Sequence, residues 1–479
     1  MEIPNNQLPI IITITGVYGV FILLYAYYFY RKINTYAEYN LAGRSMPLVP
    51  MVLTILGTSI GGAMLLGLMA DGYRIGLSQI WMLVALNGML LLFTIFFVKR
   101  LRKVGDKHEL YTVGDYAVVR YGPLARYPAS IANLVAISAL TGMQFIALAT
   151  IFKLLFGLEM TQGILLACAL LTLKTYLGGF TSVVWSDAVQ GTIQTLGILS
   201  LFAAVYFLSG GWSEIASRAE ATGQQALFVL TSMSPYKIFI FVFTIGAAVL
   251  VRQDFWSRIW AARDLNTTVK AYWLSCILLL ITGLVIISTG ALAKVGLGIV
   301  SEPASMVYYH VIQEAMPFWF FVLMLVTLIA TVVSCADSFF IAGASTIVSD
   351  FIHPNFKGAT DRQLLLCSRG AVIIMAVISL TLAMAVPGLI QLWITGSAIL
   401  VSSLLVPLLL GVLWSRPSRR AGTSAMWFGL IASLAWQLSG QSANWSPVFI
   451  GVAISTLTLF SVMLLERTQG EPALAKNEA

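Results

Sequence analysis

The chain has 479 residues, of which 59% are hydrophobic and only 10% are charged, and its formal net charge is +8. Soluble domains carry about 25% charged residues, so this composition excludes soluble enzymes, nucleic-acid binders, secreted disulfide scaffolds and disordered chains. The positive charge is then assigned to cytoplasmic loops rather than to nucleic-acid binding. The composition therefore predicts a polytopic membrane protein. We expect it to be all-α and to lie in the cell (inner) membrane.

Chemical motifs of the common enzyme classes are absent from the sequence. It contains no HExxH motif, no paired CxxC, no P-loop and no GxGxxG. Three of its four cysteines lie in apolar runs, which is not the pattern of a disulfide framework. We therefore expect neither an enzyme nor a resident metal or organic cofactor, and no ATP-driven transport by this chain alone.

Membrane-spanning segments follow one another along almost the whole chain. A spanning helix needs about 20 mostly apolar residues, and thirteen segments meet this rule. The predicted spans are 8–30, 48–72, 78–98, 127–156, 161–177, 180–208, 237–256, 268–293, 316–349, 368–386, 389–414, 422–438 and 446–465.

The Lys and Arg residues predict the orientation of these spans. With the N-terminus outside and the C-terminus cytoplasmic, only five of the 28 Lys and Arg residues lie outside. This bias obeys the positive-inside rule and requires an odd number of spans. The five outer residues are Arg74, Lys153, Arg218, Lys237 and Lys294, and the tail 467–479 is cytoplasmic.

The second span contains a segment that forms a poor helix, Gly57-Thr58-Ser59-Ile60-Gly61-Gly62. Each glycine costs about 0.8–1 kcal/mol relative to alanine in a helix interior. Close helix packing is one explanation. The other is a discontinuous helix whose freed carbonyls bind an ion at mid-membrane. A weaker counterpart, residues 243–248, lies five spans later, as expected for two inverted repeats.

Two acidic residues are predicted inside spans, Asp187 and Asp337, whereas the other acids are placed in loops or at span ends. A carboxylate in the hydrocarbon region is costly and needs a cavity, a partner or an ion. Ser334, Asp337 and Ser338 share one helix face and suit a small cation. A structural hydrogen bond is the alternative role for each of them.

The sequence resembles the sodium/solute symporter family. Residues 178–197, GGFTSVVWSDAVQGTIQTLG, match the family signature, with Ser186 in place of the usual threonine. Further similar segments are GRSMP at 43–47, GYRIG at 72–76, TVGDYAVVRYG at 112–122, RQDFWSRIWAARD at 252–264 and SCADS at 334–338.

The resemblance implies a fold of the LeuT type in a single transporter domain, 1–470. It places two five-helix inverted repeats at 48–208 and 237–414, formed by spans 2–6 and 7–11. One extra N-terminal helix, 8–30, precedes them, and two C-terminal helices, 422–465, follow.

The resemblance also implies two cation sites. The main sodium site would use the carbonyls of Gly57, Ile60 and Thr331, the hydroxyl of Ser334, and the side chain of residue 335. That residue is usually Ser or Thr in the family but is Cys335 here, a weak acceptor for sodium. The second cation site would use Asp187, Ser334, Asp337 and Ser338. The cysteine leaves a proton open as the coupling ion.

The solute is expected beside the broken helices. The resemblance implies that sialic-acid transporters of this family hold a carboxylate with an Arg in the helix that matches span 4. Residues 127–152 contain no Arg or Lys, which argues against a large acidic sugar. Aromatic candidates favour a zwitterion or an organic cation, such as an amino acid, choline or betaine; sugars, pantothenate and monocarboxylates stay open. The candidates are Thr58, Ser59, Gly62, Gln79, Trp81, Asn87, Gln144, Phe145, Phe243 and Thr244.

The predicted function is sodium-coupled uptake of a small organic solute by alternating access. Proton-coupled symport on the same fold and a transporter-like membrane sensor are the alternatives. A passive channel, which would need no ion site, is a further competing class. The partners expected are the solute, sodium and the lipid bilayer, without nucleic acid, and the family resemblance implies a monomer.

Overall fold

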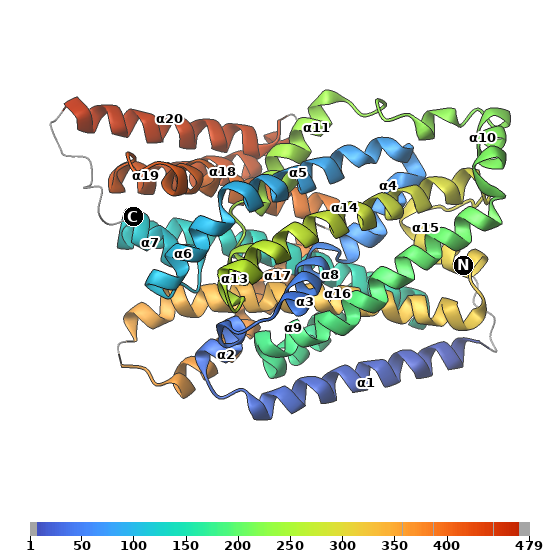
Figure 1. Ribbon diagram of the computed structural model, residues 1–479, viewed down its shortest axis with the longest axis horizontal. Helices are drawn as coiled ribbons and strands as arrows, with labels where there is room; N and C mark the ends of the chain where they lie inside the picture. Colours follow the sequence, from blue (N-terminus) through green and yellow to red (C-terminus); the bar gives the residue numbers. More distant parts are fainter. Residues whose placement is uncertain (1–6, 357, 387, 444, 469–479) are drawn as a thin grey trace.

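The computed structural model describes residues 7–356, 358–386, 388–443 and 445–468. Within these ranges the chain is helical, and its one isolated β-bridge joins Met46 to Ala262. Ten helices of the described residues are long and apolar enough to cross a membrane. Figure 1 shows them running along the long axis of one bundle, with the start of the first helix and the end of the last at opposite ends.

The first half of the chain forms ten α-helices. They are α1 (Leu8–Lys32), α2 (Tyr36–Leu41), α3 (Leu48–Ser59), α4 (Leu68–Ile75), α5 (Ile80–Phe96), α6 (Val98–His108), α7 (Val113–Tyr121), α8 (Arg126–Phe156), α9 (Met160–Leu208) and α10 (Gly211–Ala221).

The second half follows the same pattern of long and short helices. They are α11 (Pro235–Phe241), α12 (Ala247–Val249), α13 (Gln253–Ala261), α14 (Leu265–Val295), α15 (Val307–Ala315), α16 (Phe318–Thr346), α17 (Asp361–Ala385), α18 (Leu389–Leu413), α19 (Arg419–Leu438) and α20 (Pro447–Thr468).

The predicted total of thirteen spans is not confirmed, because ten helices of the described residues are long and apolar enough to cross a membrane. Predicted spans 161–177 and 180–208 both lie in α9, where Gly179 leaves helical geometry with φ +63° and divides the element between the two predicted spans. A Cβ at Gly179 would lie 2.6 Å from the ring of Tyr39, so the bend also needs a residue without a side chain. α19, which covers predicted span 422–438, is not among the ten apolar helices. The division into two repeats stays a prediction.

The predicted break in the second span is confirmed. α3 ends at Ser59, and Ile60 leaves helical geometry with φ −96° and ψ 69°. The helix resumes as a π-helical turn, Ala63–Gly67, before α4. In the second half a π-helical turn at Val242–Gly246 precedes α12, and the helix is interrupted at 250–252, later than the predicted 243–248.

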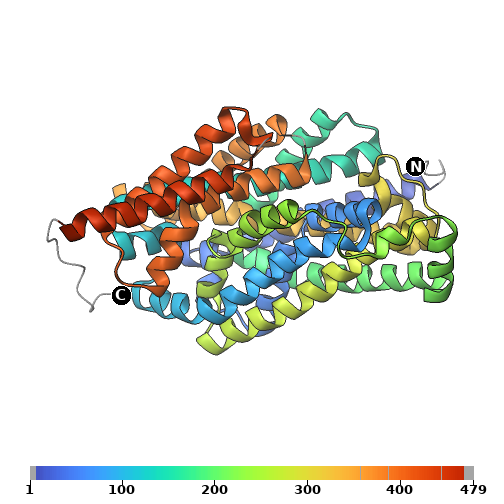
Figure 2. The same ribbon diagram turned by 90° about the horizontal axis from the view of Figure 1, so that it is seen from above.

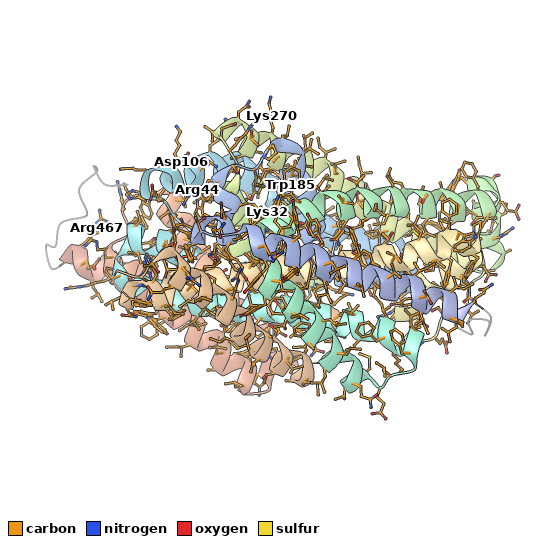
Figure 3. All side chains as sticks on the ribbon, turned by 90° about the horizontal axis from the view of Figure 1, so that it is seen from below. Lys32, Arg44, Asp106, Trp185, Lys270 and Arg467 are labelled. Atoms are coloured by element: carbon orange, nitrogen blue, oxygen red, sulfur yellow. The ribbon has the colours of Figure 1, made fainter. Side chains whose placement is uncertain are left out.

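The position of α16 determines where the site forms. This helix packs against α3, α8, α9 and α13, so its polar face meets the break in α3. α1 lies along one edge of the bundle in Figure 1. In Figure 2, α19 and α20 (red) lie on one flank and α14 (yellow-green) on the other. Side chains labelled in Figure 3 place Arg44, Asp106 and Arg467 towards one end of the bundle.

Candidate ion and solute site

Side-chain amides from neighbouring helices satisfy the backbone at the break in α3. The Ile60 carbonyl accepts a hydrogen bond from Nε2 of Gln194 at 2.8 Å. The Gly62 amide donates to Oε1 of Gln144 at 3.1 Å. A broken helix in a bilayer needs such partners, because no bulk water reaches its free N–H and C=O groups. Gln144, predicted to bind solute, therefore stabilises the break.

Three of the five residues predicted for the main sodium site lie together. The thiol of Cys335 donates to the carbonyls of Gly57 at 3.1 Å and Thr58 at 2.9 Å. A Cβ at Gly57 would lie 3.0 Å from Oγ of Ser334. The cysteine thus acts as a hydrogen-bond donor to a carbonyl that was predicted to bind sodium.

The other two residues of that predicted site have separate partners. The carbonyl of Ile60 is held by Gln194, as described above. The hydroxyl of Thr331 donates to the Thr327 carbonyl of its own helix at 2.8 Å. Neither contact links Ile60 or Thr331 to Cys335.

The residues predicted for the second cation site divide among three environments. Asp187, fully buried on α9, accepts hydrogen bonds from Thr54 at 2.6 Å and from Ser334. Asp337, fully buried on α16, forms an ion pair with Lys174 and accepts a hydrogen bond from Thr175 at 2.6 Å.

Ser338 has a third environment. Its hydroxyl accepts a hydrogen bond from the guanidinium of Arg258 at 2.8 Å and lies 2.9 Å from the hydroxyl of Thr58. The same guanidinium donates to Thr54 at 3.1 Å and to Thr58. Ser338 therefore faces a positive charge supplied by the chain itself.

The prediction placed only Asp187 and Asp337 inside spans and the other acids in loops or at span ends. Of those other acids, Asp71, Asp254 and Asp350 are also buried. Asp254 forms a two-point ion pair with Arg252 at 2.6 and 2.9 Å. Such pairing is the condition under which charges are found in a protein interior.

Three of the Lys and Arg residues predicted to lie on the cytoplasmic side are buried rather than in exposed loops. Lys174, Arg252 and Arg258 have relative exposures of only 3%, 3% and 1%. Loop placement was inferred from the position of each residue relative to the spans, which does not reveal a charge that has a buried partner.

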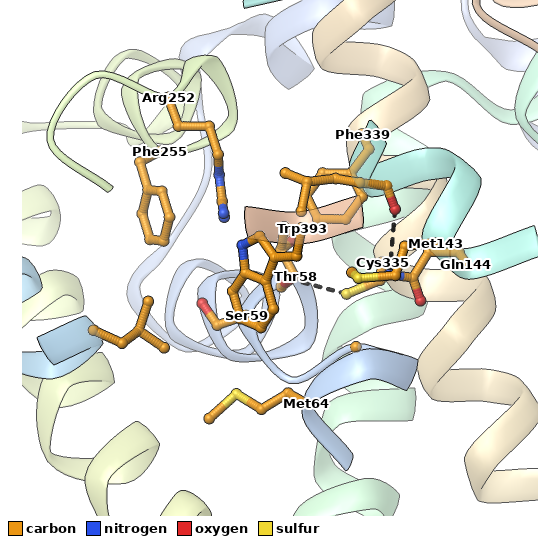
Figure 4. Close-up of a pocket in the computed structure, with 13 residues that line it drawn as sticks. Thr58, Ser59, Met64, Met143, Gln144, Arg252, Phe255, Cys335, Phe339 and Trp393 are labelled. Carbon is orange, nitrogen blue, oxygen red and sulfur yellow. Dashed lines mark hydrogen bonds between the residues drawn. The ribbon is translucent and has the colours of Figure 1, made fainter. Parts of the chain in front are cut away.

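A small cavity of about 20 Å³ lies at the break, which is space for about one water. Its lining includes the predicted residues Thr58, Ser59 and Gln144, together with Gly61 and Cys335. Figure 4 shows Arg252 and Phe255 entering from one side, opposite Cys335, with Trp393 between. This conformation is closed, since no organic solute fits in such a volume.

The side chains that the sequence analysis missed give this cavity its chemical character. The Arg252 guanidinium lines it while stacking 4.7 Å from the ring of Phe255 and 5.6 Å from that of Phe339. Arg252 is the first residue of the segment 252–264, which resembles a family motif. Its place in that motif could have marked it as a candidate site residue. The positions of Phe339 and Trp393 depend on helix rotation. The missed lining residues are Met64, Leu86, Leu140, Met143, Arg252, Phe255, Phe339 and Trp393.

Polar residues of the predicted solute set that lie outside this cavity contact neighbouring elements. Gln79 donates to Asp71 at 3.0 Å, and the indole of Trp81 donates to the Leu230 carbonyl at 2.8 Å. With its amide oriented to satisfy both atoms, Asn87 bonds the backbone of α14 at Cys276 and Leu280.

The other predicted solute residues outside the cavity pack within or between helices. Phe145 packs against Phe340, and Phe243 stacks on Phe239. Thr244 donates to the Ile240 carbonyl one turn earlier, and Gly62 lies against Ala147 and Val332. None of these four residues is among those that line the cavity of the closed conformation.

Comparisons with known proteins agree with this architecture. The chain is 22% identical to the high-affinity proline transporter PutP of Bacillus subtilis (strain 168), covering 94% of this chain and 97% of the relative. It is 28% identical to the sodium/pantothenate symporter of Haemophilus influenzae over 44% of each chain. A solved Na⁺-coupled sialic acid symporter, substrate-bound and outward-open, matches 97% of this chain with a TM-score of 0.79 at 17% identity, which shows the fold. The model of the sodium:solute symporter family matches residues 39–429, so this chain belongs to that family.

Proposed function

We propose that this chain couples sodium entry to the uptake of a small carboxylate-bearing solute, with zwitterions such as amino acids as the preferred class. The family and its transporter relatives support sodium-coupled symport of a small solute. The proposal adds the direction of transport, the solute class and the residues that bind. The single observation that carries the solute class is the guanidinium of Arg252 in the cavity wall.

Arg252 is suited to hold a carboxylate in a dry site. Guanidinium groups pair with carboxylates through two parallel hydrogen bonds, and such charge-assisted bonds are the strong ones in proteins. Asp254 and two aromatic rings hold the Arg252 side chain in place. Proline and pantothenate, which the two relatives are named for, both carry a carboxylate. Choline, which was an open alternative, carries no carboxylate to accept a hydrogen bond from Arg252.

Sodium would bind at Asp187 in this proposal. Sodium prefers hard oxygen ligands, and Asp187 lies with the hydroxyls of Thr54 and Ser334. A Cβ at Gly57 would lie 3.7 Å from the Asp187 carboxyl carbon, which places the last turn of α3 beside the carboxylate. Helix α3 therefore lies between the proposed sodium site and the solute cavity. A movement of α3 that closes the sodium site would also change the shape of the solute cavity.

The closed cavity supports transport by alternating access. A solute enters only when helices around the break separate, and release on the other side requires a second opening. We propose that one chain does this as a monomer within a single domain, residues 1–470, with the N-terminus outside and the C-terminus cytoplasmic.

The decisive experiment is uptake into proteoliposomes under a sodium gradient or a pH gradient, imposed separately. The solutes are proline, glycine betaine, choline, pantothenate and short monocarboxylates. Betaine and choline form a matched pair, because both carry a quaternary ammonium and only betaine carries a carboxylate. We expect sodium-driven uptake of carboxylate solutes and none of choline. Uptake driven by the pH gradient alone would instead establish proton coupling.

A substitution tests the role of Arg252. Arg252→Gln is expected to raise KM for the solute about 10- to 100-fold, because one charge-assisted pair contributes about 1.5–3 kcal/mol. The substitution also leaves Asp254 unpaired, so Arg252→Gln/Asp254→Asn serves as the control that removes the buried charge. An unchanged KM in the double variant would reject Arg252 as the carboxylate anchor.

A further inference from the structure

The Asp337 carboxylate is neutralised by a residue of the same protein. Lys174 and Thr175 both come from α9, and both point at Asp337 on α16. Lys174 is 3% exposed and Asp337 is fully buried. Lys174 also lines an apolar cavity of about 300 Å³ bounded by α1, α8, α9 and α16, and its ammonium pairs with Asp337.

The hydroxyl of Ser338 also accepts a hydrogen bond from a positively charged side chain of the same protein. Arg258 reaches from α13 and donates through one guanidinium nitrogen to Ser338, Thr54 and Thr58. A second nitrogen donates to the Asp254 carbonyl at 2.9 Å, which anchors the side chain. A sodium ion at Ser338 would meet this positive charge at close range in a low-dielectric interior.

Asp187 differs from Asp337 in its partners. Its two described hydrogen bonds come from the neutral hydroxyls of Thr54 and Ser334. The hydroxyl of Thr54 lies between Asp187 and the guanidinium of Arg258. Of the two carboxylates predicted to bind cations, Asp337 pairs directly with an ammonium, whereas Asp187 meets the Arg258 guanidinium only through the hydroxyl of Thr54.

We propose that Lys174 and Arg258 are tethered cations that occupy the Asp337 and Ser338 part of the expected second cation site, so that this transporter binds a single sodium ion, at Asp187. The inference rests on the proposed function and adds its ion stoichiometry. The residues around Asp337 and Ser338 do not fit a mobile cation, because their acceptor atoms already face fixed positive charges. The chain would then move one sodium ion per cycle.

The test is equilibrium binding of radioactive sodium to the purified, detergent-solubilised protein, with the Hill coefficient of sodium-driven uptake as a second readout. The unmodified protein is expected to bind one sodium with a Hill coefficient near 1. Lys174→Met removes the ammonium at nearly constant length, and we expect a second bound sodium and a Hill coefficient that moves towards 2.

Two further variants keep the result interpretable. Lys153→Met removes a positive charge from the exposed end of α8 and should leave one bound sodium. Lys174→Met/Asp337→Leu removes both charges of the pair and should also bind one. The double variant also lacks the ion pair, so a difference between it and Lys174→Met in sodium binding is due to the free Asp337 carboxylate and not to loss of the pair.

Each outcome decides one of the two claims. Two sodium ions bound by the unmodified protein, or one bound by a folded Lys174→Met variant, would overturn the tethered-cation proposal while leaving sodium-coupled symport intact. Uptake that ignores sodium altogether would overturn the proposed function instead. If Lys174→Met does not fold, the stoichiometry of the unmodified protein decides the matter.

Discussion

At the scale of single residues, Cys335 is the most informative departure from the family, which usually has Ser or Thr at this position of the segment 334–338. Its thiol donates to the carbonyls of Gly57 and Thr58. A thiol is a weak acceptor, whereas a hydroxyl offers a hard oxygen. The sulfur therefore ties α16 to α3 without adding a good sodium ligand.

Cys335→Ser is expected to raise the apparent affinity for sodium by about fivefold, which corresponds to about 1 kcal/mol for one improved polar contact. The measurement is the sodium dependence of uptake at a fixed solute concentration. Cys276→Ser is the matched control, because that thiol is buried elsewhere, 3.7 Å from the hydroxyl of Thr94. An identical sodium titration in Cys335→Ser would count against sodium binding beside this residue.

The second prediction at the scale of single residues concerns the carboxylate of Asp187. Asp187→Asn keeps the size of the side chain and removes its charge, so sodium-driven accumulation of solute should be lost. Asp71→Asn changes another buried carboxylate, which Gln79 contacts at 3.0 Å, and should retain sodium dependence. A passive channel would behave differently, because its flux would persist in Asp187→Asn.

At the scale of elements, the break between α3 and α4 is held by tight packing as well as by hydrogen bonds. A Cβ at Gly61 would lie 2.6 Å from Sγ of Cys335, and one at Gly62 would lie 2.6 Å from Cβ of Ala147. Both distances are too short for real side-chain atoms. The glycines are thus needed both for the break and for the close approach of α8 and α16.

Gly62→Ala is therefore expected to destabilise the protein by about 1–3 kcal/mol, the usual cost of overpacking, and to abolish uptake. Thermal unfolding in detergent and proteoliposome uptake measure the two effects. Gly88→Ala in α5 is the control, because a Cβ there meets nothing within 4 Å. That control should gain up to about 1 kcal/mol from better helix propensity. Equal effects of the two variants would show that the break does not depend on tight packing.

At the scale of the whole molecule, the closed cavity implies that helices must separate for transport. Cys335 lines the cavity, so its thiol reports on opening. In a background with Cys168, Cys276 and Cys367 replaced by serine, labelling by a small thiol reagent should be slow and should accelerate in conditions that open the cavity.

Saturating solute should then protect Cys335 from the reagent, because the solute fills the same cavity. Labelling rates measured with and without sodium and solute check this expectation. Fast labelling that neither ligand alters would contradict a cavity that closes in the transport cycle.

Much of the architecture was readable from residue order alone. Segment length and hydropathy located the spans, and the glycine cluster at 57–62 located the break, because both are local properties of the chain. Motifs in order along the chain identified the family. The interruption of α9 at Gly179 was also readable, since it falls between the predicted spans 161–177 and 180–208.

The partners of the polar side chains depended on the packed structure. Several of these helices are apolar around their whole circumference, so no periodic pattern in the sequence shows which face meets which neighbour. The pairing of Lys174 with Asp337, the contact of Arg258 with Ser338, and the place of Arg252 in the cavity join elements far apart in sequence. Sequence position identifies which residues carry charge, whereas helix rotation and packing determine which charges meet.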